Sequence, residues 1–398
     1  MPEPVSPLIQ GDEVAAGGDT PLERAARAGR IAERWLFGPG MRELTALFGV
    51  DFEVIADGSL SQDNDDWLHL SEELPDWVGE VLDGAGSLPE PAGPVIETLR
   101  RALHLERWAA DKFNFRSQDG ATYRERNQAV SGGFDAATED AVRRHATALG
   151  LVHGTRPRHG RYDGTLVLGG GWRSPLLRAR YAAHLERAGV SLGKLYFLGS
   201  PRFLLTDPPE RELTDSYAPA AVDEFDLMIA GATGEYQLRL GEVVMICGCA
   251  SMDLICPRWK YAELEVAAET PPRYTHERSG TLLDADAHPH GTVLSASTGR
   301  PPYRPDTTDT LALWARQAEP RAGQRVLVVT TQVFVPFQTF DSIKRLYLPR
   351  AVEVDVVGFD AGWSDRPETP EYLLQETLSA IRSARRLLVE AIATMLAG

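Results

Sequence analysis

Hydrophobic residues follow a helical spacing in the first part of this chain of 398 residues. Apolar positions recur every three to four residues, which is typical of helices with one buried face. Helices are predicted over 21–37, 94–116 and 135–149. The segment 21–155 is therefore expected to be a helical N-terminal domain. Residues 1–20 are rich in Gly, Pro and Asp and are predicted to be a flexible tail.

From residue 160 the pattern changes to short, wholly apolar runs that alternate with amphipathic segments. Strands are predicted over 165–168, 194–198, 243–246, 292–294, 325–330 and 351–357, and helices over 174–188, 222–238, 306–317, 336–347 and 370–396. Strands that are apolar throughout indicate a parallel sheet that is covered on both faces. The prediction for 160–398 is thus an α/β fold: a Rossmann-like, mainly parallel sheet with helices on both faces and an insertion over 241–290.

A glycine turn joins the first of these strands to the helix that follows it. Gly169, Gly170 and Gly171 come directly after the strand, and Ser174 is read as the N-cap of the helix, with Gly189 closing it. Glycines let backbone N–H groups approach a ligand, and a helix N-terminus favours negative charge. The turn is a candidate anion site, to which Arg173 or Arg178 could add a bidentate contact. The alternative is an ordinary turn.

Polar residues also follow other predicted strands or precede a helix. In a doubly wound sheet, ligands bind at the carboxyl ends of the strands. Hydroxyl groups and free N–H groups at these ends could hold a phosphate, a ribose or a carboxylate, although ordinary turns and caps use the same residues. The candidate ligand-binding residues here are Gly199, Ser200, Thr307, Thr308, Thr310, Thr330, Thr331 and Gln332.

Two acidic residues are candidates for a general base. Asp309 and Glu224 each stand at the start of a predicted helix, where a carboxylate can be buried against a ligand and have its pKa tuned. Either could equally be a first-turn acid that the helix dipole stabilises. The dinucleotide fingerprint is not complete, because Ser174 occupies the place of its third glycine. The chain also has no Walker A loop and no Gly-x-Ser-x-Gly elbow.

Charge and composition limit the classes of partner that the protein is expected to bind. Asp and Glu number 57 against 41 Lys and Arg, for a net charge of −16, which argues against wholesale binding to nucleic acid or to an anionic membrane. Three cysteines, no apolar run of about 18 residues and no secretory leader together predict a cytoplasmic protein. The expected partner is a small-molecule ligand, and the oligomeric state stays open.

The cysteines and histidines raise the possibility of a zinc site. Thiolate and imidazole are suitable zinc ligands. The spacing of the cysteines is not that of a standard zinc ribbon or finger, so buried thiols beside a strand are the favoured alternative and no metal is assigned. The residues concerned are Cys247, Cys249, Cys256, His276, His288 and His290.

In order along residues 160–360, these motifs resemble the SanA/ElyC/YdcF-like family. The matching positions are Gly169 to Gly171, Arg178, Gly199 with Ser200, Thr307 to Thr310, and Thr330 with Thr331. The resemblance implies a Rossmann-like domain that binds a nucleotide or an S-adenosylmethionine-type ligand. The chain departs from the family pattern after the last strand end, where residues 333–338 replace a histidine and an arginine. It departs again at Asp309, where asparagine is common.

Two functions follow from these observations. The first is binding of a small anionic or nucleotide-like ligand at the strand ends, with transferase or hydrolase chemistry. The second is a non-catalytic module that senses a metabolite or recruits a partner. The identity of the ligand or cofactor stays open.

Overall fold

The computed structural model of the protein describes residues 18–57, 74–83, 92–115, 131–204, 210–247, 275–299, 304–363 and 368–397. The chain divides into two compact units. The helical unit comprises Met1–Arg156, Gln332–Ala351 and Asp360–Gly398, and the sheet unit comprises Pro157–Thr331 and Val352–Phe359. The helical unit therefore draws on both ends of the chain, whereas the sequence pattern grouped 160–398 into one domain.

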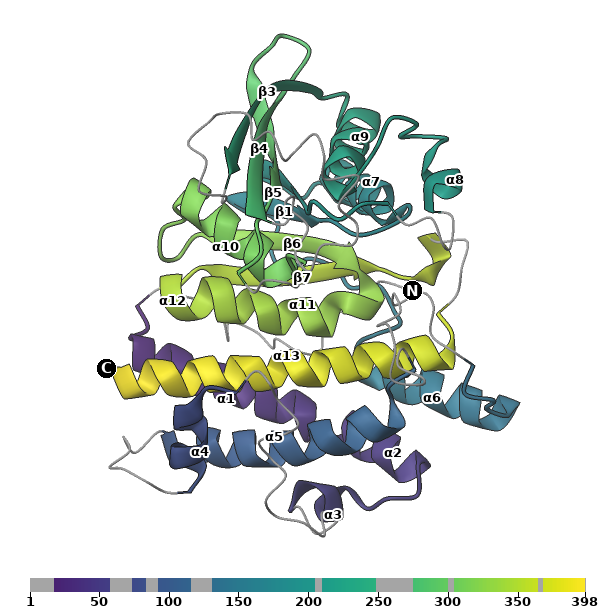
Figure 1. The fold of residues 1–398 in the computed structure, drawn as a ribbon, viewed down its shortest axis with the longest axis vertical. Helices are drawn as coiled ribbons and strands as arrows, with labels where there is room; N and C mark the ends of the chain where they lie inside the picture. Colours follow the sequence, from purple (N-terminus) through teal and green to yellow (C-terminus); the bar gives the residue numbers. More distant parts are fainter. Residues whose placement is uncertain are drawn as a thin grey trace. The chain divides into compact units, whose positions relative to one another are not determined.

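The sheet unit is built on a seven-stranded sheet in the described part of the chain, in the order β3-β4-β5-β2-β1-β6-β7 (Figure 1). The strands are β1 Gly164–Leu168, β2 Lys194–Gly199, β3 Arg239–Cys247, β4 His276–Leu283, β5 Pro289–Ser295, β6 Arg325–Thr331 and β7 Glu353–Phe359. From β5 to β7 all neighbours are parallel, and β4 is antiparallel to both β3 and β5. The mainly parallel α/β fold is confirmed.

The apolar strands form the middle of this sheet. Leu166 of β1 lies between Tyr196 of β2 and Val328 of β6, and β1 and β7 are buried at every position. Burial on both faces is the reason for their unbroken apolar sequence. β4 was not predicted, because its buried and half-buried positions alternate and its polar residues hide the pattern.

Helices cover both faces of the sheet. The ring of Tyr196 lies 5.6 Å from Trp314, whereas that of its neighbour Phe197 lies 6.0 Å from Tyr236. Neighbouring strand residues point to opposite faces, so α9 and α10 cover opposite faces, with α7 packed beside α9 (Figure 1). The helices of this unit are α7 Ser174–Arg187, α8 Glu210–Thr214, α9 Glu224–Tyr236 and α10 Thr307–Ala318.

Helix caps follow the sequence in two of these helices. Asp223 and Asp306 are N-caps whose side chains accept hydrogen bonds from the backbone N–H groups of Asp226 and Asp309. The expected cap at Ser174 is wrong: Arg173 holds the N-cap position without a side-chain bond, and Ser174 is already helical. An N-cap residue usually has an extended backbone, from which its side chain reaches the first turn. Arg173 instead has αR angles, and Ser174 already lies inside the helix, so its hydroxyl does not cap it.

The helical unit packs around the long C-terminal helix α13. This helix contacts α1, α5, α6 and α11 and is buried over most of its length. Arg385 of α13 forms a 2.6 Å ion pair with Glu106 of α5. The helices are α1 Pro21–Leu36, α2 Pro39–Leu47, α3 Phe52–Ala56, α4 Asp76–Leu82, α5 Ala92–Lys112, α6 Ala136–Ala148, α11 Val335–Ser342, the π-helix η6 Ile343–Tyr347, α12 Leu348–Arg350 and α13 Pro370–Ala397, with 3-10 turns at Gln332–Phe334 and Ala361–Trp363.

His104 makes the stability of the helical unit sensitive to acid. Burial lowers the pKa of this imidazole below its usual 6.5; Asp57 opposes the shift and Arg100 reinforces it. The unfolded chain therefore takes up a proton at a higher pH than the folded chain, so stability contributed by neutral His104 is present above about pH 6.5 and is lost as the pH falls. We expect His104→Gln to flatten the fall in urea midpoint between about pH 7 and pH 5. An unchanged slope would contradict this assignment.

Candidate functional site

The strand order reverses between β1 and β6. Chain connections from β1 lead through α7 to β2 on one side, while β6 and β7 lie on the other. In open α/β sheets, the crevice for ligands lies at the carboxyl ends of the two strands at such a switch point. Here those ends are the glycine turn after Leu168 and the pair Thr330-Thr331. Sequence motifs that are 160 residues apart are thus brought to one edge of the sheet.

The glycine turn packs too closely for side chains at its first position. A Cβ atom on Gly169 would lie 2.5 Å from the carbonyl oxygen of Leu198 and 3.0 Å from the Cα of Gly199. The turns that end β1 and β2 therefore touch. Gly170 has more room, with Arg178 Nη1 at 3.2 Å from an added Cβ.

The N–H groups of Gly170 and Gly171 are the parts of this turn that could bind a ligand. No residue in the described part of the chain accepts a hydrogen bond from either group. Both glycines are partly exposed, and Trp172 after them has a left-handed backbone with φ 58°. The turn leads into the N-terminus of α7, a helix of 14 residues, where the dipole favours negative charge.

The two arginines of this region have different environments. Arg178 is 3% exposed, and its guanidinium donates to the carbonyl oxygens of Leu168 and Gly169 and to the hydroxyl of Thr331. It therefore fixes the ends of β1 and β6 rather than standing open to solvent. Arg173, at the N-cap of α7, is exposed. Of the two, Arg173 is the one with a charge that a ligand could reach.

Ser200 and Glu224, both predicted site residues, meet at the end of β2. The Ser200 hydroxyl donates to Glu224 Oε2 at 2.6 Å, and Arg202 Nε donates to Glu224 Oε1, also at 2.6 Å. Glu224 is the first residue of α9, and a Cβ on Gly199 would lie 3.0 Å from its carbonyl oxygen. Both carboxylate oxygens are thus occupied by protein groups.

A second buried ion pair lies beside this cluster. Asp223, the N-cap of α9, is 0% exposed and accepts a 2.6 Å bond from Arg278 Nη2. The Arg278 guanidinium also lies over the ring of Phe225, 4.2 Å from its centroid. Sequence reasoning missed Arg202 and Arg278. The acids at the start of α9 were a signal that basic partners were needed, but nothing in the sequence named them.

The predicted hydroxyl residues divide into bonded and unbonded groups. Thr310 donates to the carbonyl oxygen of Asp306 at 3.0 Å and so belongs to the helix start. Thr308 and Thr330 are 6% and 0% exposed, and their hydroxyls have no partner among the described residues. Ser295, at the end of β5, has the same property and was not predicted. Buried hydroxyls are usually paired, so these three atoms at strand ends and a helix start need water or a ligand.

Asp309 completes the cap of α10. Its Oδ2 accepts from the N–H of Asp306 at 3.0 Å and its Oδ1 accepts from the N–H of Gly299 at 3.1 Å. Both carboxylate oxygens of Asp309 therefore accept backbone hydrogen bonds that hold the start of α10. Thr307, beside it, is half-buried at the first position of the helix.

Gln332 belongs to the helical unit and its side chain is fully engaged there. It is 0% exposed, its amide donates to the carbonyl oxygen of Gly150 at 2.7 Å, and its carbonyl accepts from the hydroxyl of Thr155 at 3.2 Å. Gln332 therefore fixes the loop that follows α6.

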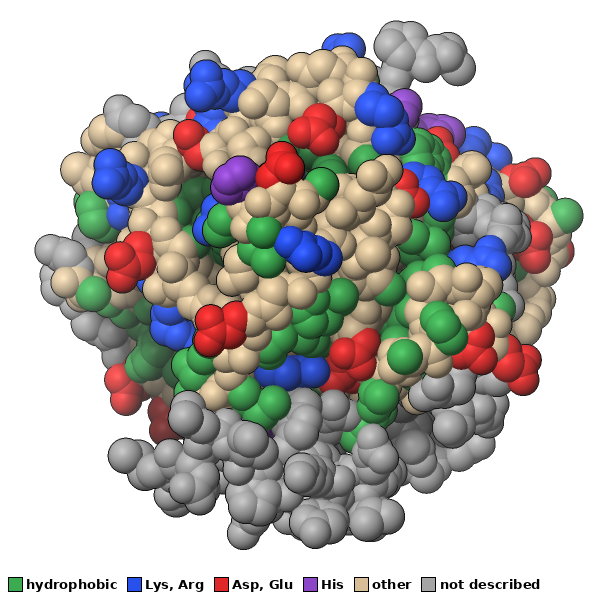
Figure 2. Space-filling model, turned by 90° about the horizontal axis from the view of Figure 1, so that it is seen from above, with side chains coloured by type: hydrophobic (Ala, Val, Ile, Leu, Met, Phe, Trp, Pro, Cys, Tyr) green, Lys and Arg blue, Asp and Glu red, His purple; other side chains and the backbone are tan. Residues whose placement is uncertain are grey.

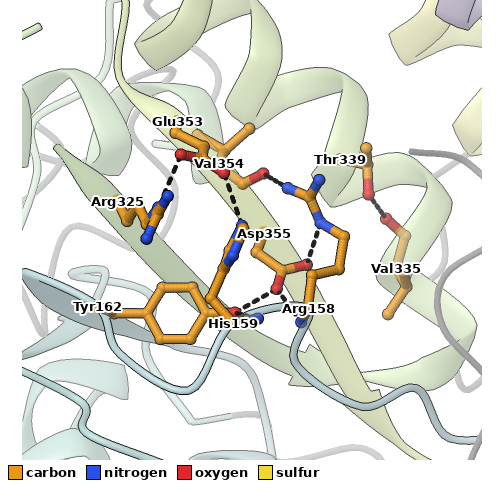
Figure 3. A network of polar contacts seen from close by, with 9 residues as sticks. All are labelled: Arg158, His159, Tyr162, Arg325, Val335, Thr339, Glu353, Val354 and Asp355. Carbon is orange, nitrogen blue, oxygen red and sulfur yellow. Dashed lines mark hydrogen bonds and ion pairs between the residues drawn. The ribbon is translucent and has the colours of Figure 1, made fainter. Parts of the chain in front are cut away.

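A separate buried network lies at the opposite, amino-terminal ends of β6 and β7 (Figure 3). Asp355 is 2% exposed and accepts from the N–H of Arg158 at 2.7 Å, from its Nε at 3.2 Å and from the hydroxyl of Tyr162. Burial, and then the negative charge of Asp355, raise the pKa of Tyr162 far above its usual value, so its hydroxyl remains a donor. Glu353 lies between His159 Nε2 at 2.6 Å and Arg325 Nε at 2.9 Å.

Two of the six possible metal ligands lie outside the described residues, and His276, His288 and His290 lie within them. Cys249 and Cys256 are among those not described, and Cys247 ends β3. Within the described ranges, no group of three or more His, Cys, Asp or Glu side chains could hold a metal ion. Among the helices that the structure describes, none has the length and apolar character needed to cross a membrane.

Comparison with known proteins finds relatives in mycobacteria. The chain is 30% identical over 270 residues to uncharacterized protein Rv3785 of Mycobacterium tuberculosis (strain ATCC 25618 / H37Rv), covering 64% of this chain and 67% of that protein. Uncharacterized protein Mb3814 of Mycobacterium bovis matches with the same identity and the same coverage of each chain. No family model matches the chain, and no solved structure matches it significantly.

Proposed function

The chain belongs to the family of these mycobacterial proteins, whose names state no activity, and from the geometry we propose that it binds a small anionic, nucleotide-like ligand at the carboxyl ends of β1 and β6. The observation that carries the proposal is that the N–H groups of the partly exposed residues Gly170 and Gly171 have no acceptor in the described part of the chain. They stand where the sheet order reverses and where α7 begins.

Each part of the ligand would meet a different set of groups. The anionic part, a phosphate or carboxylate, would accept hydrogen bonds from the glycine amides and a charge-assisted contact from Arg173. Arg178 and Thr331, joined by hydrogen bonds, hold the ends of β1 and β6 next to this turn. The hydroxyls of Thr308 and Thr330 would bond to a sugar or to ordered water. A nucleotide or S-adenosylmethionine has both an ionic and a hydroxyl-bearing part, which makes these the first classes to test.

The second candidate function is a non-catalytic binding module, and the two candidate bases favour it. Asp309 has both oxygens in the cap of α10, and Glu224 has both oxygens in bonds to Ser200 and Arg202. Carboxylate oxygens that already hold the protein's own donors serve the local structure, which favours a binding role over proton transfer for these two residues. Transferase or hydrolase chemistry, the resemblance to the SanA/ElyC/YdcF-like family and a cytoplasmic location stay predictions.

A thermal-shift series tests the binding proposal. The panel is inorganic phosphate, nucleoside mono- and triphosphates, sugar nucleotides and S-adenosylmethionine. A ligand at about 100 times its Kd adds about 2.7 kcal/mol to the stability of the native state. We expect at least one compound to raise the melting temperature of the wild type, and Arg173→Ala to lose most of that shift.

Arg187→Ala is the matched control, because Arg187 is exposed at the other end of the same helix. It removes the same charge without touching the glycine turn, so its ligand response should equal that of the wild type. A panel with no response, or equal losses in the two variants, would contradict the proposal.

A further inference from the structure

We propose that Glu224 binds the ribose hydroxyls of a ribonucleoside ligand, which narrows the ligand class of the site proposed above and rests on that proposal. The order of the parallel strands is the starting point. In chain order β1, β2, β5, β6 and β7 are the first to fifth of these strands, and they lie side by side as third, second, first, fourth and fifth. Dinucleotide-binding folds have this order, with the phosphates at the first turn and a ribose hydroxyl held by an acidic residue that follows.

Glu224 supplies a carboxylate at the end of the second of these strands, although it belongs to α9. Its N–H donates to the carbonyl oxygen of Arg202 at 3.1 Å, and its carboxylate accepts from Ser200 and from Arg202. The acid thus comes 24 residues after the strand end that it serves. The dinucleotide fingerprint expects an acid about 20 residues after the glycines, so its spacing does not find Glu224.

The carboxylate of Glu224 can accept further hydrogen bonds. A carboxylate offers about four acceptor positions, and among the described residues the side chains of Ser200 and Arg202 are the ones that bond to it. The Glu224 side chain is 12% exposed, so it is not sealed in the core. The two protein donors hold the carboxylate in one orientation, and the adjacent hydroxyls of a ribose are donors suited to its remaining positions.

The glycine turn and Glu224 stand at the ends of neighbouring strands. The two strand ends touch, since a Cβ on Gly169 would lie 3.0 Å from the Cα of Gly199. Neighbouring strands are about 4.8 Å apart, a separation that the bonds between the phosphate and the ribose hydroxyls of a nucleotide can span. One ligand could therefore place its phosphate at the glycine amides and its ribose at Glu224. Thr330 ends β6, on the other side of β1, and would meet a different part of the ligand.

The end of β5, next to β2, adds a buried polar group on the same side of the glycine turn. Ser295 is 0% exposed, lies directly opposite Gly199, and its hydroxyl has no partner among the described residues. Buried hydroxyls are usually paired. An ordered water or a hydroxyl of the ligand would satisfy Ser295 beside the proposed ribose position.

The charges in this part of the sheet unit favour a small ligand over a large polyanion. Figure 2 looks down from above the view of Figure 1, where α9 is among the upper elements, and acidic and basic side chains are interspersed there among the described residues. At the start of α9, Glu224 forms an ion pair with Arg202. Asp223 forms another with Arg278. Attraction for an anion therefore comes from the glycine amides, the start of α7 and Arg173, and not from a broad basic surface.

Paired ribonucleotides and deoxyribonucleotides test the role of the ribose on the wild-type chain. The probes are ADP, GDP, CDP and UDP, each with its 2′-deoxy counterpart, with S-adenosylmethionine as a further ribonucleoside and pyrophosphate as an anion without ribose. Hydrogen bonds to a charged group contribute a factor of about 10 to 100 in affinity. Calorimetric titration should therefore show at least one ribonucleotide binding about 10- to 100-fold more tightly than its deoxy form.

The outcomes separate this inference from the proposal on which it rests. Equal affinity for the two forms, or binding of pyrophosphate alone, would overturn the ribose contact and leave the anion site in place. If none of the probes bound, both proposals would fail. Binding of S-adenosylmethionine alone is decided by the variant at Glu224.

Glu224→Gln tests the residue itself. The amide has one acceptor oxygen in place of two and no charge. We expect this variant to bind the ribonucleoside about 10-fold more weakly and to lose the preference over the deoxy form, while its response to pyrophosphate stays that of the wild type. Glu235→Gln is the matched control, because Glu235 lies near the other end of α9 and pairs with the exposed Arg180.

The readout does not depend on how stable the Glu224 variant is. The preference for ribose is a ratio of two affinities measured on one variant, so a general loss of stability does not imitate its disappearance. A ribose preference that persisted in Glu224→Gln, or an undiminished affinity of that variant for S-adenosylmethionine, would overturn the assignment.

Discussion

Asp355→Asn is expected to destabilise the sheet unit by about 3 to 5 kcal/mol, the usual result of removing one partner from a buried ion pair. Asp355 is 2% exposed, and the Arg158 side chain that it holds is 6% exposed. The amide has one acceptor oxygen in place of two, and it offers N–H donors to groups that are themselves donors. The Tyr162 hydroxyl loses its acceptor at the same time.

Hydrogen exchange of the β6 and β7 amides measures this effect within the sheet unit, which matters because a chain of two units need not unfold in one step. Glu235→Gln is the control, because Glu235 pairs with the partly exposed Arg180 near the surface. Exposed ion pairs contribute between about 0 and 1 kcal/mol. If Asp355→Asn lowered protection no more than Glu235→Gln does, the network of Figure 3 would be dispensable for stability.

The strands that are buried on both faces could be predicted, because such burial requires an unbroken apolar sequence. β1, β6 and β7 lie in the middle or parallel part of the sheet, and their apolar runs match their observed bounds to within about two residues. β4 could not be predicted in this way. Its Glu277 and Arg278 are stabilised by Arg316 and Asp223, partners that lie far away in the chain.

The candidate site shows the same limit. Glycines after a strand, an acid at a helix start and threonines at a strand end are local signals, and each was found. Which of them meet is set by the strand order, and strand order is not a local property. Ser200 and Glu224 were both proposed, but their 2.6 Å contact and the role of Arg202 depend on how α9 packs on β2. The same packing gives Glu224 a structural role that its position alone could not reveal.

The two first glycines of the turn after β1 should separate stability from ligand binding. Gly169→Ala would put a Cβ 2.5 Å from the backbone oxygen of Leu198, and backbone in the middle of a sheet cannot move aside. We expect a loss of about 3 kcal/mol, the upper part of the usual cost of overpacking. Gly170→Ala meets its nearest neighbour, Arg178 Nη1, at 3.2 Å, so the cost should stay within about 1 kcal/mol.

In the binding measurement, by contrast, the variant with the small stability cost, Gly170→Ala, is expected to show the large effect. A methyl group on Gly170 lies 3.2 Å from Arg178 Nη1 and 3.3 Å from Ser174 Cβ, beside the N–H groups proposed to hold the anion. Gly170→Ala should therefore keep most of its stability and lose the ligand-induced shift. Gly133→Ala is not a suitable comparison, because Gly133 has a positive φ of 65°; Gly93→Ala is, since nothing lies within 4 Å of an added Cβ there. If Gly170→Ala responded to the ligand as fully as Gly93→Ala, the anion would have to bind away from this turn, because an intact fold would leave no other explanation for an undisturbed response.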